Sequence, residues 1–202
     1  MKKLIIFDLD GVLVDACEWH RIALNNALER VAKYEITDTE HKETFNGIPT
    51  RKKLQILVDR RIITPDQVEE IYNLKQSLTV DAIVSNAKLR QEKVEMIIAL
   101  REAGYIVTCF TNSIKQTAHL MLQKTGIYDL LEMIVTNQDV VEPKPSPEGY
   151  NKIIDYYGVD RGDVYIVEDS PKGIQAAMAA TKNVFVVKGP NEVNIDLIKE
   201  IL

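Results

Sequence analysis

The sequence has few cysteines, few aromatic residues and no long apolar run. Its only two cysteines, Cys17 and Cys109, show no paired spacing, so we expect no disulfide framework and a reducing, cytoplasmic setting. No stretch approaches the ~20 apolar residues that cross a bilayer, which predicts no membrane association. The apolar run after Lys2 and Lys3 is too short for a secretory signal and ends at Asp8.

Basic residues are also in the minority, with 25 Lys and Arg against 30 Asp and Glu and a formal net charge of -5. Nucleic-acid interfaces favour a basic balance, so we expect no nucleic-acid partner. A chain of 202 residues that is 46% hydrophobic and 27% charged can bury a full core. Composition therefore predicts a globular protein, which we expect to be a monomer or a weak homodimer.

Five short apolar runs have the length and character of buried strands. They are residues 3–7, 105–110, 133–135, 164–167 and 184–187. Helical patterns separate the last four. Ser113 with Gln116 resembles a capping box, and Ser170 with Pro171 resembles a helix start. Strands that alternate with helices predict an α/β fold with a doubly wound parallel sheet.

Residues 16–80 break this alternation, because they are typical of helix throughout and contain no convincing strand. The simplest interpretation is a small all-helical domain inserted after the first strand. The α/β core would then be discontinuous and would consist of residues 1–15 and 81–202.

Two carboxylates, Asp8 and Asp10, follow the first predicted strand and are followed at once by Gly11. In open α/β sheets, ligands bind at the carboxyl ends of the strands. Two such carboxylates repel by roughly 4 kcal/mol at ~4 Å and an effective dielectric of ~20, so we expect a cation between them. Taken alone, Asp-Leu-Asp-Gly could also be an ordinary turn.

The other strands are followed by polar groups of complementary chemistry. These are Thr111-Asn112-Ser113, Lys144 between prolines, and Glu168-Asp169. Carboxylates at the strand ends are the oxygen ligands that hold Mg²⁺ together with water and a substrate phosphate. Thr111, backbone amides at a helix start and Lys144 could bind phosphoryl oxygens. One carboxylate could act as a nucleophile and another as a general acid and base.

Four segments in this order resemble the motifs of the haloacid dehalogenase superfamily. They are Asp8-Leu9-Asp10-Gly11, Thr111-Asn112, Lys144-Pro145 and Glu168-Asp169-Ser170. The resemblance implies that Asp8 is the nucleophile and Asp10 the general acid and base. It also implies that Thr111 and Lys144 clamp the phosphoryl group. Mg²⁺ would be held by Asp8, the Asp10 carbonyl and Asp169, with Glu168 in support.

A helical insert after the first motif is similar to the branch that includes β-phosphoglucomutase and phosphoglycolate phosphatase. This resemblance makes His20, Arg51 and Lys75 in the insert candidates for substrate binding, together with Asn112 and Ser113. His20 stands where the mutase-like branch has a histidine near the general acid. Arg51 follows a glycine loop similar to that branch's substrate loop, although the spacing differs. Lys75 could face either a cleft or water.

These observations predict a Mg²⁺-dependent phosphatase that hydrolyses a small phosphate monoester, most simply a sugar phosphate, through an aspartyl-phosphate. Two alternatives stay open. A phosphomutase would pass the phosphoryl group to a second hydroxyl of its substrate instead of water. A non-catalytic binding module could use the same scaffold, although such modules typically lose one of the acidic residues that this chain retains.

Overall fold

The computed structural model describes residues 2–201 and divides the chain into two compact units. One unit comprises Met1–Asp15 and Lys88–Leu202, and the other comprises Ala16–Ala87. The boundary expected after residue 80 falls inside helix α4 (Gln67–Asn86). The second unit instead runs to the end of that helix, because a continuous helix keeps its hydrogen-bond ladder across residue 80.

The larger unit contains a sheet of five parallel strands. They are β1 (Lys3–Phe7), β2 (Tyr105–Phe110), β3 (Met133–Val135), β4 (Val164–Glu168) and β5 (Asn183–Val186). Their order in the sheet is β3-β2-β1-β4-β5. β1 lies at the centre and pairs in parallel with both β2 and β4, which explains why its apolar run is buried. The predicted parallel α/β fold with a helical insert is confirmed.

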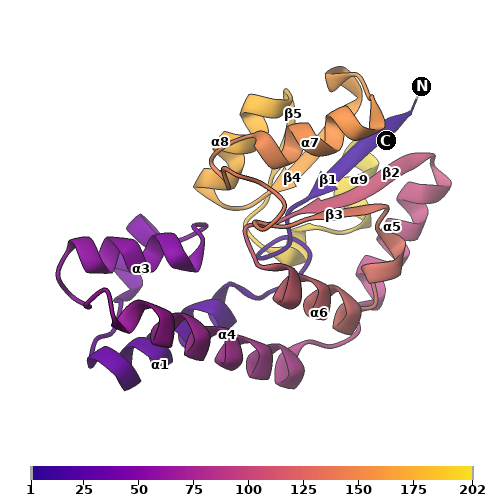
Figure 1. Ribbon diagram of the computed structural model, residues 1–202. Helices are drawn as coiled ribbons and strands as arrows, with labels where there is room; N and C mark the ends of the chain where they lie inside the picture. Colours follow the sequence, from indigo (N-terminus) through magenta and orange to yellow (C-terminus); the bar gives the residue numbers. More distant parts are fainter. Residues whose placement is uncertain (1, 202) are drawn as a thin grey trace. The chain divides into compact units, whose positions relative to one another are not determined.

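Helices cover both faces of this sheet (Figure 1). On one face lie α7 (Glu148–Tyr157) and α8 (Pro171–Ala180), which share a core with Leu4 and Ile6 of β1. On the other face lie α5 (Gln91–Glu102), α6 (Lys115–Thr125) and α9 (Ile195–Ile201). Short 3₁₀ turns, η2 (Tyr128–Leu130), η3 (Arg161–Asp163) and η4 (Pro190–Glu192), connect these elements.

The smaller unit is helical over its described residues. It consists of α1 (Cys17–Ala32), α2 (Asp38–Glu40), a π-helical turn η1 (His41–Phe45), α3 (Thr50–Asp59) and α4. Both α1 and α3 pack on α4. The unit has its own hydrophobic core, made of Leu24, Ala27, Leu28, Ile36, Phe45, Leu54, Leu57, Ile63 and Ile71.

Two helix starts in the larger unit differ in how well the sequence predicted them. The Ser170 hydroxyl accepts a hydrogen bond of 3.1 Å from the Gly173 N–H, and Pro171 opens α8, as expected. The capping box at Ser113 is wrong, since α6 begins only at Lys115, whose N–H donates to Gln138 Oε1. The Ser113 hydroxyl is bonded elsewhere, which concerns the site described below.

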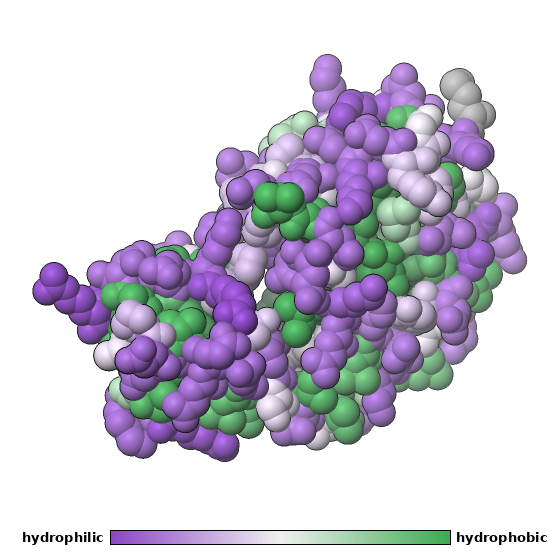
Figure 2. Space-filling view, in the orientation of Figure 1, coloured by the Kyte–Doolittle hydropathy of each residue, from purple (hydrophilic) through white to green (hydrophobic). Residues whose placement is uncertain are grey.

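Polar side chains dominate the surface seen in Figure 2, with apolar side chains in smaller areas between them. This agrees with a chain in which 27% of residues are charged. In the part of the chain that the structure describes, none of the helices has the length and apolar character needed to cross a bilayer.

Candidate active site

Asp8 lies where the central strand β1 leaves the sheet at its carboxyl end. Its Oδ1 accepts a hydrogen bond of 2.6 Å from the ammonium group of Lys144, and both side chains are buried. The same ammonium donates to Glu168 Oε1 at 2.6 Å and to the Phe110 carbonyl oxygen at 2.9 Å. Lys144, from the loop before α7, therefore joins the ends of β1, β2 and β4.

Asp10 lies two residues further on and is held by the segment that follows β2. Its Oδ2 accepts a hydrogen bond of 2.7 Å from the Ser113 hydroxyl and a longer one of 3.3 Å from the Thr111 hydroxyl. Thr111 also accepts a bond from the Ser113 N–H at 2.9 Å. Because Ser113 binds a carboxylate across the sheet edge, it does not cap α6.

Asp169 completes a group of acidic side chains around Asp8. Asp8, Glu168 and Asp169 each offer a carboxylate oxygen within 4.8 Å of the others. Gly11 permits this approach, since its φ is +91° and a Cβ there would lie 2.2 Å from Asp169 Oδ2. Asp169 Oδ1 is buried and accepts no hydrogen bond. An unpaired buried carboxylate oxygen beside two other carboxylates fits a divalent cation with oxygen ligands.

The pKa shifts of these side chains also favour a bound cation. Burial raises the pKa of Asp8 well above its usual range, and the charges of Glu168 and Asp169 add to this effect while Lys144 opposes it. Burial, followed by the charge on Glu168, raises the pKa of Asp169 to about 7. Burial disfavours the charged form of Lys144, but the charges of Asp8 and Glu168 outweigh it and raise its pKa. Both carboxyl pKa values are raised in part because neighbouring carboxylates crowd together and Lys144 supplies one opposing positive charge.

Asn112 holds the loop that carries Lys144. Its amide oxygen accepts from the Lys144 N–H at 3.1 Å, and its amide nitrogen donates to the Lys144 carbonyl at 3.3 Å. These contacts fix the position of Lys144, and Asn112 stays a prediction as a substrate-binding residue.

The three candidates from the helical unit contact groups within that unit. The Lys75 ammonium is buried and lies 3.1 Å from His20 Nδ1. Arg51 pairs with Glu69 at 3.0 Å and stacks over the Tyr72 ring, whose centroid is 4.0 Å from its guanidinium carbon. His20, Arg51 and Lys75 stay predictions as substrate-binding residues.

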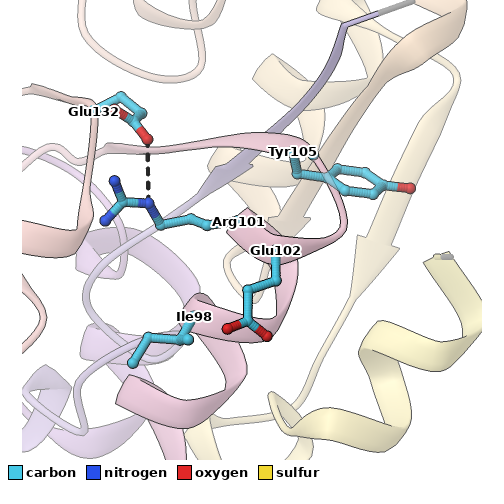
Figure 3. A pocket seen from close by; sticks show the side chains of 6 residues that line it. Ile98, Arg101, Glu102, Tyr105 and Glu132 are labelled. Carbon is cyan, nitrogen blue, oxygen red and sulfur yellow. Dashed lines mark ion pairs between the residues drawn. The ribbon is translucent and has the colours of Figure 1, made fainter.

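A surface hollow of about 500 Å³ lies at the other edge of the sheet, where β2 begins (Figure 3). It is lined by Ile98, Arg101, Glu102, Gly104, Tyr105 and Glu132. Arg101 and Glu132 form an ion pair of 3.3 Å there. The acidic cluster around Asp8 is not part of this hollow, so the candidate active site is the Asp8 edge.

Sequence reasoning missed Tyr150, whose hydroxyl donates to Glu168 Oε1 at 2.7 Å. Tyr150 lies in the first turn of α7, and its ring meets Phe110 edge-on with centroids 4.9 Å apart. The available signal was its place in the first turn of the helix after the Lys144 loop. A helix that covers the sheet turns its apolar face toward the strand ends.

With this arrangement in view, the family can be stated. The chain belongs to the haloacid dehalogenase-like hydrolase family, whose sequence model matches residues 5–187. The match spans every segment that contributes to the Asp8 cluster, and it makes the chain an enzyme of the hydrolase class. The predicted resemblance is confirmed.

Particular relatives are similar over most of their length. A phosphoglycolate phosphatase of Nitrosococcus oceani is 24% identical over 182 residues, which are 88% of this chain and 80% of that protein. The crystal structure of CbbY from Rhodobacter sphaeroides, in complex with phosphate, matches with a TM-score of 0.82 and 22% identity, covering 94% and 87% of the two chains.

A third relative is a structure of β-phosphoglucomutase from Clostridium difficile. It has a TM-score of 0.83 and 21% identity, and covers 100% of this chain and 97% of that one. At these identities the structural matches establish the fold.

Proposed function

We propose that the protein is a phosphatase that hydrolyses a small phosphate monoester, most simply a sugar phosphate. The observation that carries the proposal is the 2.6 Å contact between Lys144 and Asp8, at a strand end where Asp10 and Thr111 also lie. Such a site offers a carboxylate nucleophile, a second carboxylate for proton transfer and donors for phosphoryl oxygens. Phosphatases among the relatives support the same reaction.

The reaction would take two steps. In the first, an Asp8 carboxylate oxygen forms a bond to phosphorus while the bond from phosphorus to the ester oxygen breaks. Asp10 gives its proton to that departing oxygen. In the second, Asp10 takes a proton from water, and the water oxygen bonds to phosphorus while the bond from phosphorus to Asp8 breaks. Inorganic phosphate leaves and the Asp8 carboxylate is restored. Lys144 and Thr111 hold the phosphoryl oxygens in both steps.

Mg²⁺ is the cofactor we propose for this site. Asp8, Asp169 and the Asp10 carbonyl would hold it, with Glu168 in support, and the partnerless Asp169 Oδ1 supports this assignment. When bound, the ion would neutralise part of the charge on the transferring phosphoryl group.

The groups we propose to bind the rest of the substrate are His20, Arg51 and Lys75 of the helical unit, together with Asn112 and Ser113. The positive charges of Arg51 and Lys75 suit a phosphorylated ligand. The cysteine content supports a cytoplasmic enzyme, and we propose a monomer or weak homodimer with no nucleic-acid or membrane partner.

The test is a panel of phosphorylated metabolites assayed for phosphate release with and without Mg²⁺. Wild-type protein should release phosphate from a subset of sugar phosphates, and chelation of the metal should abolish release. Asp8→Asn should lower kcat by roughly 10³-fold or more because it removes the nucleophile. Asp155→Asn, at an exposed position of α7, is the matched control and should retain full activity. Wild-type rates in Asp8→Asn would exclude Asp8 as the nucleophile.

A phosphomutase is the second candidate, favoured by the fold shared with β-phosphoglucomutase over the whole chain. A mutase must also bind a phosphate at the other end of its substrate, and the buried Lys75 beside His20 suits that role. Incubation with β-glucose 1-phosphate separates the two reactions. Glucose 6-phosphate would indicate transfer, whereas free phosphate would indicate hydrolysis. A protein that binds these esters and turns over none would be a binding module.

A further inference from the structure

The buried ammonium group of Lys144 lies close to two aromatic rings as well as to its three oxygen acceptors. Its nitrogen is 4.7 Å from the centroid of the Phe110 ring and 5.1 Å from that of the Tyr150 ring. Aromatic faces attract cations, most strongly where water is excluded. The two rings therefore help to keep this ammonium beside its oxygen acceptors.

Besides the contact of its ring with Lys144, Tyr150 also contacts this cluster through its hydroxyl. The hydroxyl and the Lys144 ammonium donate to one oxygen, Glu168 Oε1, at 2.7 and 2.6 Å. The other oxygen of Glu168 accepts from the N–H groups of Asp169 and Ser170 at 3.1 and 3.4 Å. Tyr150 and Glu168 both have 0% exposure, so water does not replace a lost donor at little cost.

Two glycines show how closely α7 and α8 pack against the residues around Lys144. A Cβ on Gly149 of α7 would lie 2.3 Å from the Phe110 ring, and one on Gly173 of α8 would lie 2.0 Å from Glu168 Oε1. The backbone thus sets the positions of Phe110 and Glu168. Tyr150 supplies the hydroxyl that fixes the remaining orientation of the Glu168 carboxylate.

We infer that Tyr150 is a positioning residue of this enzyme. It acts through Glu168, keeping that carboxylate turned so that it holds Lys144 against Asp8 and orders the neighbouring Asp169 backbone. This inference rests on the proposed phosphatase function and assigns a role to a residue outside the reacting groups.

The first experiment compares Tyr150→Phe with wild type. The variant keeps the ring, and with it the packing and the cation–π contact, and loses only the hydroxyl. We expect kcat to fall about tenfold, because a buried hydrogen bond to a charged group is removed, while KM changes less than about twofold. Tyr156→Phe, on an exposed tyrosine of the same helix, is the control and should match wild type. A lowered melting temperature with unchanged kcat would mean a purely structural role and would overturn the inference.

The second experiment asks whether Tyr150 acts through Glu168. In a Glu168→Gln background, Tyr150→Phe should cost less than about threefold, since interacting residues are not additive. An equal loss in both backgrounds would overturn the inference.

A third measurement does not depend on turnover. Calorimetric titration with Mg²⁺ should give a dissociation constant about tenfold higher for Tyr150→Phe than for wild type, as for other groups that orient metal ligands. An unchanged constant would overturn the inference. If wild type binds Mg²⁺ but hydrolyses no phosphate ester, the proposed function fails, and this measurement still decides the role of Tyr150. If wild type neither binds Mg²⁺ nor hydrolyses an ester, both proposals fail.

Discussion

The carboxylates around Asp8 outnumber the positive charge that lies next to them. Lys144 is paired with Asp8 and Glu168, and Asp169 lies in the same cluster with a partnerless oxygen. A phosphate ester would meet repulsion of roughly 4 kcal/mol from each uncompensated charge at ~4 Å and an effective dielectric of ~20. At the scale of single residues, this imbalance is the physical reason for expecting Mg²⁺.

Asp10 offers a prediction about proton transfer. Its carboxylate is held by Ser113, so it is fixed beside the cluster. If Asp10 protonates the departing oxygen, Asp10→Asn should slow hydrolysis of an alkyl phosphate by roughly 10²–10⁴-fold. The loss should be much smaller for p-nitrophenyl phosphate, whose leaving group needs no proton.

The measurement is the ratio of kcat/KM for the two substrates in wild type and variant. Ser113→Ala should shift this ratio in the same direction by a smaller factor, since it only loosens Asp10. Equal losses on both substrates would contradict general-acid catalysis by Asp10.

At the scale of elements, α8 contributes to the site because Gly173 has no side chain where the helix meets Glu168. Gly173→Ala would place a methyl group 2.0 Å from Glu168 Oε1, although alanine favours a helix more than glycine does. We expect this overpacking to cost about 1–3 kcal/mol of unfolding free energy and to lower kcat. Gly189→Ala is the matched control, because nothing lies within 4 Å of its added Cβ. Urea unfolding and phosphate release measure both effects, and a Gly173→Ala variant as stable and active as wild type would disprove the tight contact.

The sequence predicted all five strands to within one residue at each end, because buried parallel strands read as short apolar runs. It predicted the α8 start, where the cap is a local contact of Ser170. It failed at Ser113, because that hydroxyl bonds Asp10, which is 103 positions away along the chain. Local patterns cannot rank a cap against a distant carboxylate.

The residues of the candidate site likewise divide into those that have a local signal in the sequence and those placed by tertiary contacts. Asp8, Lys144 and Glu168 could be selected because each lies at or after the end of a strand that ends at the same sheet edge. Tyr150 had only the weaker signal of its place in the first turn of α7, since its contact with Glu168 depends on how α7 packs on the sheet. The hydrogen bond from the Lys144 N–H to the Asn112 side chain is likewise a contact between two loops, which the sequence pattern does not reveal.

At the scale of the whole molecule, the two units have separate cores, and His41 reports on the helical one. Burial, followed by the positive charges of Lys53 and Arg21, lowers the pKa of His41 from 6.5 to about 4. Between these values the unfolded chain binds the proton and the folded chain does not. Stability should therefore fall as the pH drops from 6.5 toward 4.

Urea unfolding at pH 7, 6 and 5 tests this prediction, with His41→Gln as the comparison. The variant should lose less stability on acidification than wild type, because other titrating groups are common to both proteins. Identical pH dependence in the two would show that His41 is not shielded in the folded state.

The helical unit is spliced into the chain between Asp15 and Lys88, and its apolar side chains satisfy one another. It can therefore be treated as a cassette. Exchanging residues 16–87 for the corresponding stretch of a relative should yield a chimera that folds, retains the chemistry of the Asp8 edge and acquires the donor's substrate preference. If the helical unit selects the substrate, as we propose for His20, Arg51 and Lys75, substrate preference can change while the residues of the Asp8 edge stay the same.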